Sequence, residues 1–227
     1  MIGASVEVIR ERHERLLGRL REMAAANGHD PERLRIVGVT KTHPVELVRA
    51  AFDAGIRRLG ENRVQEAEPK IAAVPEAEWH LVGRLQSNKA RRAVRAFGVI
   101  HSVDSAELLD RIDRLAEEAE RPSAVLLQVN VAGESTKGGM APAALASVQP
   151  PRTVRLAGLM TIAPMGATDE EARDVFRRLR ELRDALEDRI GRAVPELSMG
   201  MSADAEAAAA EGATLVRIGT ALFGPRG

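Results

Sequence analysis

The chain has 227 residues with 33 basic and 33 acidic side chains, so its formal net charge is zero, and it contains no cysteine. The balanced charge excludes a general attraction to nucleic acid or anionic membranes, and the lack of cysteine excludes disulfides and thiolate chemistry. No apolar stretch approaches the roughly 20 residues that span a bilayer, and the N-terminus does not read as an export signal. We therefore expect a cytoplasmic protein with one domain over residues 1–227.

Apolar residues from Val6 to Met23 recur at helical spacing, which predicts an N-terminal helix. Short aliphatic runs then alternate with helical patterns, and a capping box at Thr168 and Glu171 opens one of the expected helices. The eight expected strands cover residues 34–40, 57–60, 79–82, 98–103, 123–131, 154–160, 195–198 and 214–218. This alternation predicts an α/β fold, a single-domain (β/α)8 TIM-like barrel with an extra N-terminal helix. An open doubly wound sheet is the alternative.

Three segments at strand ends suggest a binding site. Lys41 follows the first expected strand, and in a closed barrel the eighth strand lies beside it, with phosphates bound in the loops after strands 7 and 8. We expect Ser202 to be the N-cap of an alanine-rich helix whose amides could bind an anion. Gly219 and Thr220 offer close backbone approach and a hydroxyl, and Arg217 would be buried nearby. Each residue alone has a plain structural explanation, but together they suit an aldehyde that bears a phosphate.

Five motifs occur in order along almost the whole chain. They are Val39–Pro44, Gly60–Glu66, Trp79–Lys89, Leu197–Ser202 and Val216–Thr220. Together they resemble the pyridoxal phosphate homeostasis protein family, of the YggS or PROSC type, with Thr40, where many members have serine, as a mild departure. The resemblance implies a barrel like the N-terminal domain of alanine racemase, in which Lys41 holds pyridoxal 5′-phosphate (PLP) as an internal aldimine.

The same resemblance implies roles for further residues. Arg217 would face the pyridine nitrogen, where an arginine is no useful proton donor, and this limits carbanion chemistry on the ring. The phosphate would be gripped by Ser202, Gly219, Thr220 and the backbone N–H of Met201, while Asn62 and Met160 would line the cofactor.

The function implied is intracellular PLP homeostasis, that is storage, delivery or buffering of the cofactor without robust enzymatic turnover, with apo PLP-dependent enzymes as recipients. Related racemases need a tyrosine from an additional β-domain, and this chain has neither a tyrosine nor residues left for such a domain. One alternative is a PLP-dependent enzyme with weak racemase, decarboxylase or transaminase activity. Its proton carrier would be His43, His80, His101 or Lys137. A second alternative is a cofactor-free barrel that forms a Schiff base with a sugar phosphate through Lys41.

Other possible partners are less favoured by the sequence. The five histidines show no metal-ligand spacing, so we expect no metal site. A basic helix from Lys89 to Arg95 lacks the aromatic side chains that would stack on bases, so we interpret it as a solvated face rather than a nucleic-acid site. We expect a monomer.

Overall fold

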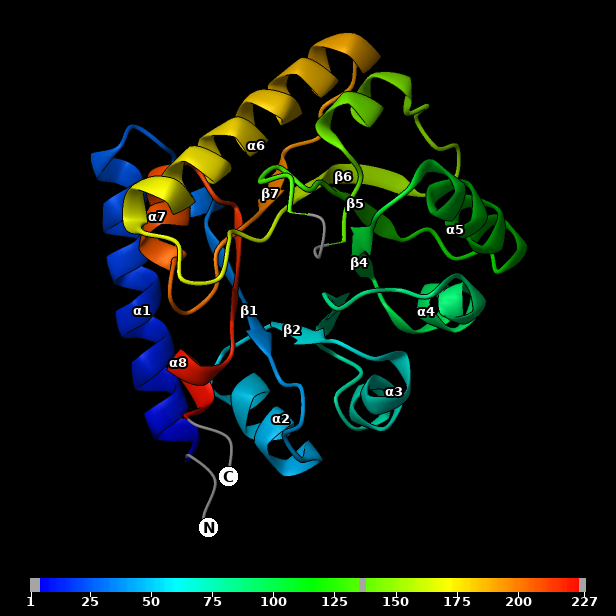
Figure 1. The fold of residues 1–227 in the computed structure, drawn as a ribbon. Helices are drawn as coiled ribbons and strands as arrows, with labels where there is room; N and C mark the ends of the chain where they lie inside the picture. The colour runs from blue at the N-terminus through cyan, green and yellow to red at the C-terminus, as the bar shows by residue number, and fades with distance from the viewer. Residues whose placement is uncertain (1–4, 135–137, 225–227) are drawn as a thin grey trace.

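The structure, a computed structural model, describes residues 5–134 and 138–224, and its strands close into a parallel barrel in sequential order (Figure 1). The strands are β1 (Arg35–Val39), β2 (Arg58–Glu61), β3 (Glu78–Leu81), β4 (Val99–Val103), β5 (Ala124–Gln128), β6 (Arg155–Met160), β7 (Glu196–Ser198) and β8 (Leu215–Ile218). All eight expected strands are present and the barrel is confirmed. The fifth is shorter than expected, because beyond Gln128 the chain keeps only an isolated bridge between Val129 and Met140.

Helices surround the barrel on its outside (Figure 1). The α-helices are α1 (Val6–Ala26), α2 (Val45–Asp53), α3 (Val64–Ala73), α4 (Ala90–Ala96), α5 (Ala106–Glu118), α6 (Asp169–Ile190), α7 (Ala205–Ala210) and α8 (Thr220–Phe223), with 3-10 turns at Pro31–Arg33, Ser87–Lys89 and Pro142–Ser147. No helix in the described residues is both long and apolar enough to span a membrane.

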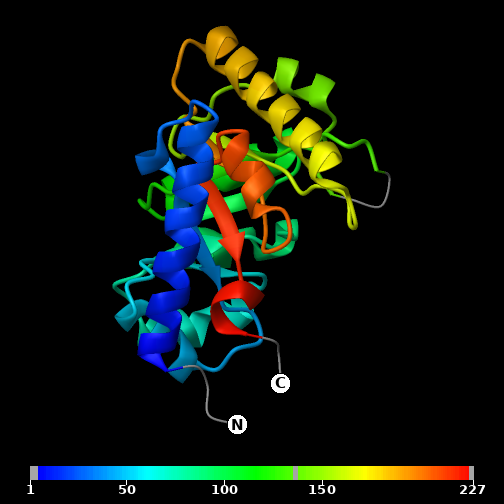
Figure 2. The same ribbon diagram turned by 90° about the vertical axis from the view of Figure 1, so that its left-hand side faces the viewer.

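The predicted N-terminal helix is α1, and it precedes the barrel. Ser5 caps it by accepting a hydrogen bond from the Val8 N–H, and the stripe of Ile9, Leu16 and Leu20 is buried. Figure 2 shows α1 running past α7 and α8, so the start of the chain covers the elements at its end. This packing supports the closure of the barrel, where β1 pairs with β8 and Val37 lies opposite Arg217.

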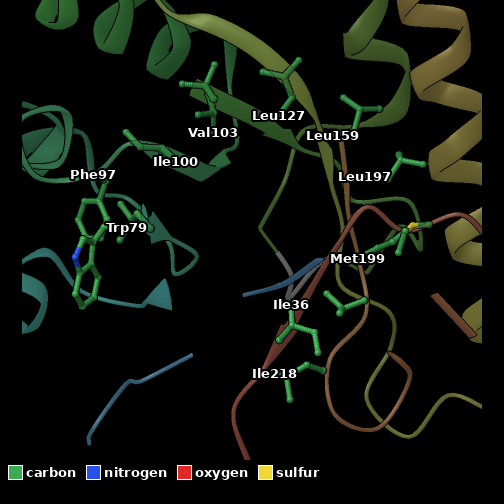
Figure 3. Packing of buried hydrophobic residues seen from close by; sticks show 14 of the residues in the cluster. Ile36, Trp79, Phe97, Ile100, Val103, Leu127, Leu159, Leu197, Met199 and Ile218 are labelled. Carbon is green, nitrogen blue, oxygen red and sulfur yellow. The ribbon is translucent and has the colours of Figure 1, made fainter. Parts of the chain in front are cut away.

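Side chains alternate along the strands between two layers. One layer faces the helices and contains aliphatic residues from successive strands, among them Ile36, Ile100, Leu127 and Ile218 (Figure 3). The other layer fills the barrel interior with Val37, Val99, Ala124, Leu126, Ala157, Met160 and Leu215. Because side chains fill the interior, the ends of the strands are left as the place for a ligand.

Two expected helix starts had different outcomes. The capping box at Thr168 and Glu171 is confirmed at the start of α6, with both of its hydrogen bonds present. The assignment of Ser202 as an N-cap is wrong, because α7 begins at Ala205 with Asp204 in the cap position. The Asp204 carboxylate accepts the N–H of Met201 at 2.6 Å, which closes a turn and delays the helix.

Candidate functional site

A cavity of about 650 Å³ opens at the carboxyl-terminal ends of the strands. It brings together Lys41, Asn62, Met201, Ser202, Arg217, Gly219 and Thr220, which are seven of the eight residues expected to bind the cofactor. The remaining lining residues are Val39, His43, Val82, Gly83, Arg84, Gln128, Gly138, Ile162, Ala203 and Gly224. Lys41, Arg84 and Arg217 are cationic and the described residues of the lining include no carboxylate, so the cavity suits an anion.

Met160 is the expected residue that does not line this cavity. Its side chain is fully buried in the barrel interior, in the cluster against which Val82 and Ile162 pack. It therefore supports the floor of the cavity in this structure and does not face the space above. Lys137, one of the candidate proton carriers, lies outside the described residues.

Lys41 lies two residues beyond Val39, the last residue of β1. Thr40 is fully buried, whereas Lys41 is half-buried and reaches the cavity. Val39, two residues earlier, lines the same cavity, as the alternation along a strand requires. Lys41 is the only lysine in the described lining.

Two loops of the cavity, those after β7 and β8, present backbone amides. The N–H groups of Ser202 and Ala203 make no hydrogen bond within the described part of the chain, and neither do those of Thr220 and Ala221 in the first turn of α8. The N–H of Met201 is engaged by Asp204. The two loops therefore offer donors for an anion, with Met201 available only if Asp204 releases it.

Arg217 reaches the cavity from inside the barrel. It is 5% exposed, and its Nη1 donates to Ser198 Oγ at 2.7 Å while its Nη2 donates to the carbonyl oxygen of Thr161 at 2.9 Å. Burial lowers the pKa of Arg217 to about 10, so the guanidinium is still charged at neutral pH. A fixed cation thus lies in the cavity wall with two of its donors already committed.

A line of buried polar side chains extends from Arg217 across the interior. Beyond Ser198, the Nδ1 of His101 lies 2.8 Å from Ser198 Oγ, and the Nε2 of His101 lies 2.7 Å from the Nδ1 of His80. Burial lowers the pKa of both imidazoles, that of His101 well below its ordinary value, so both are neutral near pH 7.

The candidate proton carriers therefore separate into two groups. His80 and His101 do not line the cavity, whereas His43 does. His43 also packs edge-on against Phe223, with ring centroids 5.5 Å apart. Of these three histidines, only His43 is placed to act on a ligand.

Sequence reasoning missed several lining residues. Gly83 and Arg84 lay within the motif Trp79–Lys89, but no role was inferred for them, and Gln128 gave no signal at all. A Cβ on Gly83 would lie 2.4 Å from the carbonyl oxygen of Asn62, so only glycine fits there. Among the described residues, no group of three or more His, Asp or Glu side chains is arranged to hold a metal ion.

The residues present fit PLP. An amine for an aldehyde, a guanidinium for a ring nitrogen and unpartnered amides for a phosphate surround a cavity within the usual range for small ligands. Val39, Val82 and Ile162 add apolar surface for an aromatic ring.

The fold and cavity define a barrel of the alanine racemase class, since the family described as alanine racemase, N-terminal domain, matches residues 16–227. Within that class, the chain belongs to the pyridoxal phosphate homeostasis protein family, as its motifs predicted. It is 43% identical over 223 residues to the pyridoxal phosphate homeostasis protein of Aquifex aeolicus, covering 95% of this chain and 97% of the relative. The Escherichia coli K12 protein of the same name is 38% identical over 208 residues, 88% of each chain.

Solved structures agree with this assignment. PipY of Synechococcus elongatus PCC7942, in the structure with PLP bound, has a TM-score of 0.80 and 42% identity, covering 90% of this chain and 100% of PipY. Alanine racemase from Clostridium difficile 630 has a TM-score of 0.71 at 16% identity, covering 92% of this chain and 59% of the racemase. At that identity the racemase shows a shared fold only.

Proposed function

We propose that this protein binds PLP through Lys41 and stores, delivers or buffers the cofactor inside the cell, without robust enzymatic turnover. The observation that carries the proposal is the grouping of Lys41, Arg217 and the unpartnered amides of Ser202 and Thr220 around one cavity. Further support comes from PipY, which is 42% identical and whose structure contains PLP. Apo PLP-dependent enzymes would be the recipients.

Each residue has a distinct role in this proposal. The cofactor supplies an aldehyde, which condenses reversibly with a neutral primary amine to form a C=N bond and release one water. Lys41 provides that amine, and Ser202, Gly219 and Thr220 hold the phosphate from two loops. Arg217 would face the ring nitrogen as a hydrogen-bond donor, and Asn62 would complete the wall of the cavity. Because the attachment is reversible, an incoming amine can take the cofactor away again.

The proposed absence of robust turnover rests on two missing groups, a proton donor for the ring nitrogen and a second acid or base. Arg217 is a permanent cation that cannot usefully protonate a ring nitrogen, so the ring is a poor electron sink for a carbanion. The sequence contains no tyrosine to serve as a second acid or base. His43, the only histidine in the described lining, favours the alternative, a weak PLP-dependent enzyme.

A visible spectrum tests the binding proposal. Purified wild-type protein mixed with PLP should develop Schiff-base absorbance, and borohydride reduction followed by peptide mapping should label Lys41. The Lys41→Ala variant should show neither signal. Protein without such absorbance, or a label that persists in Lys41→Ala, would overturn the proposal. Labelling only with a ketose phosphate would instead select the cofactor-free sugar-phosphate barrel.

Isotope exchange tests the choice between carrier and enzyme. The loaded protein is incubated with single amino acids in deuterated water, and α-proton exchange is followed by NMR in the wild type and in His43→Gln. A carrier should exchange no faster than free PLP. Exchange at enzyme-like rates that His43→Gln removes would favour the enzyme. Transfer is measured separately, as recovery of activity when loaded protein is mixed with an apo enzyme.

A further inference from the structure

We propose that Glu61 and Lys70, a buried ion pair outside the cavity, are positioning residues that fix the attachment lysine by clamping Thr40. The proposal rests on the function proposed for Lys41. Glu61 ends β2 and is fully buried, and Lys70 lies on α3, which packs outside β2 (Figure 1). Neither residue lines the cavity.

Three short hydrogen bonds converge on this point. Lys70 Nζ lies 2.6 Å from Glu61 Oε1 and donates to the carbonyl oxygen of Thr40 at 2.7 Å. The Thr40 hydroxyl donates to the same Glu61 oxygen at 2.6 Å. Charged partners make such bonds about twice as strong as neutral ones. The residue directly before Lys41 is therefore held through both its side chain and its carbonyl group.

The backbone around Lys41 is restrained on both sides. The Thr40 N–H donates to the carbonyl oxygen of Gly60 at 2.9 Å, so every polar group of Thr40 is engaged. On the other side, Thr42 has φ of +66°, a left-handed conformation that is rare for a β-branched residue. Such strain persists only where the surroundings enforce it. The clamp on Thr40 is one such enforcement, and it sets where Lys41 leaves the strand.

Glu61 also affects the position of a second cavity residue, Asn62. Asn62 follows Glu61 in the chain and lines the cavity, so a shift of the Glu61 backbone would move Asn62. The ion pair thus touches the backbone beside two cavity residues. It is bonded to Thr40, which precedes Lys41, and it includes Glu61, which precedes Asn62.

Stability alone is a poor explanation for this pair. Removing two charges from water costs much of what their attraction returns, and an apolar pair of similar volume is often as stable. Glu61 also keeps one buried oxygen, Oε2, that finds no hydrogen-bond partner in the described part of the chain, which adds to the cost. Because ion pairs of this kind often add little net stability, and this one is bonded to the residue directly before the attachment lysine, a positioning role explains it better.

The pair also keeps the two lysines apart. Lys70 Nζ is buried, donates to both a carboxylate and a carbonyl oxygen, and does not reach the cavity, whereas Lys41 lines it. Lys70 therefore does not compete with Lys41 for the cofactor, although both lie beside Thr40.

Variants of the pair separate position from stability. In Glu61→Gln and Lys70→Met one partner is lost, so both variants should melt at lower temperature and bind PLP at least about tenfold more weakly per folded molecule. The double variant Glu61→Leu/Lys70→Met leaves no unpaired buried charge, so it should melt at a higher temperature than either single variant, yet its dissociation constant should remain raised. Borohydride labelling of Lys41 in the double variant should be slowed to a similar extent.

A matched control is Glu211→Gln. Glu211 is also buried, at 4% exposure, and pairs with Arg173 and Arg180 at 3.0 Å, but it does not line the cavity. This variant should lower the melting temperature while the dissociation constant stays within about twofold of the wild type. If a single variant does not fold, Thr40→Val keeps the ion pair and removes only the hydroxyl contact, and it should still weaken binding.

Two outcomes are distinguishable. If the double variant and Thr40→Val bind PLP as the wild type does, the positioning role is wrong while the proposed function stands. If the wild type itself is not labelled at Lys41, the proposed function fails first.

Discussion

Ser198 accepts a hydrogen bond from Arg217 inside the barrel, with 2.7 Å between Oγ and Nη1. A guanidinium can only donate, so the direction of this bond is fixed. The single proton of the Ser198 hydroxyl is then free to be donated to Nδ1 of His101, 2.8 Å away. The Ser198 hydroxyl makes no other hydrogen bond within the described residues, so we assign Nδ1 of His101 as the acceptor of its proton.

The same reasoning extends to His80. A neutral His101 that accepts at Nδ1 carries its proton on Nε2 and donates it to Nδ1 of His80, 2.7 Å away. His80 then carries its own proton on Nε2, which lies 3.7 Å from the carboxylate of Glu78 at the start of β3. The donors thus run in one direction, from the buried guanidinium to His80, whose Nε2 has no hydrogen-bond partner within the described residues.

Replacing Ser198 with alanine should remove one of the two hydrogen bonds that hold the Arg217 guanidinium in place. The change leaves one guanidinium donor and one histidine acceptor unpaired in a buried place, and such losses cost about 1–3 kcal/mol each. We expect PLP to bind about tenfold more weakly and the absorbance band of the bound cofactor to shift. Both are read from a spectroscopic titration of the variant against the wild type.

Ser102→Ala is the matched control for this experiment. Ser102 is also buried, on β4, but its hydroxyl has no partner in the described residues. Its loss should change neither affinity nor spectrum. Equal behaviour of the two alanine variants would show that the contact between Ser198 and Arg217 does not tune the site.

The buried histidines should make stability depend on pH. Because burial lowers the pKa of His101 well below 6.5, the unfolded chain binds a proton that the folded protein does not. The stability that His101 contributes is complete above pH 6.5 and is lost as the pH falls, by up to roughly 1.4 kcal/mol per pH unit for one proton. Denaturant unfolding between pH 8 and pH 5 measures the slope.

His101→Gln should flatten that slope, because one titrating group is gone. A residual slope should remain, since burial also lowers the pKa of His80, His13 and His29. The comparison uses slopes and not absolute stabilities, so a general destabilisation by the substitution does not affect it. An unchanged slope in His101→Gln would mean that this imidazole is protonated in the folded protein.

Much of the barrel was predictable from the sequence because its signals are local. Each short β-branched or aliphatic run of four to nine residues shows where a strand lies, and Thr168 with Glu171 shows where α6 begins. The prediction that Ser202 is an N-cap was wrong. A serine before an alanine-rich helix has the sequence of a cap, but the turn that Asp204 closes depends on backbone geometry and starts the helix later.

The site was predictable only in part. Residues at strand ends could be placed together from barrel topology, which is why Lys41, Arg217 and Thr220 share a cavity as expected. The hydrogen bonds that support these cavity residues join positions far apart in the sequence, such as His101 with Ser198 or Thr40 with Lys70. Nothing in local periodicity indicates which interior residues meet across a barrel, so these contacts needed the structure.

The phosphate loops can be tested with two ligands that differ only in the phosphate. Thr220→Val removes one hydroxyl from the cavity while keeping the size of the side chain. We expect PLP to bind about tenfold more weakly, since a charge-assisted hydrogen bond is worth roughly 1.5–3 kcal/mol. Pyridoxal, which lacks the phosphate, should bind the variant and the wild type equally. An equal loss for both ligands would place Thr220 away from the phosphate.

Gly83 should be intolerant of any side chain. A Cβ there would lie 2.4 Å from the carbonyl oxygen and 2.6 Å from the Cα of Asn62, and backbone atoms cannot rotate aside as a flexible side chain does. Gly83→Ala should therefore push Asn62 out of place and weaken PLP binding, with a lower melting temperature.

Gly98→Ala provides the comparison for Gly83. Its Cβ would meet only the carbonyl oxygen of Trp79, at 3.9 Å, which is an ordinary contact, and Gly98 is exposed. This variant should keep both affinity and melting temperature, because an added methyl group there displaces nothing. Titration and thermal melting of the two variants side by side separate crowding at the cavity from a general effect of replacing glycine. Normal PLP binding by Gly83→Ala would mean that the loop after β3 can move away from Asn62 without disturbing the cavity.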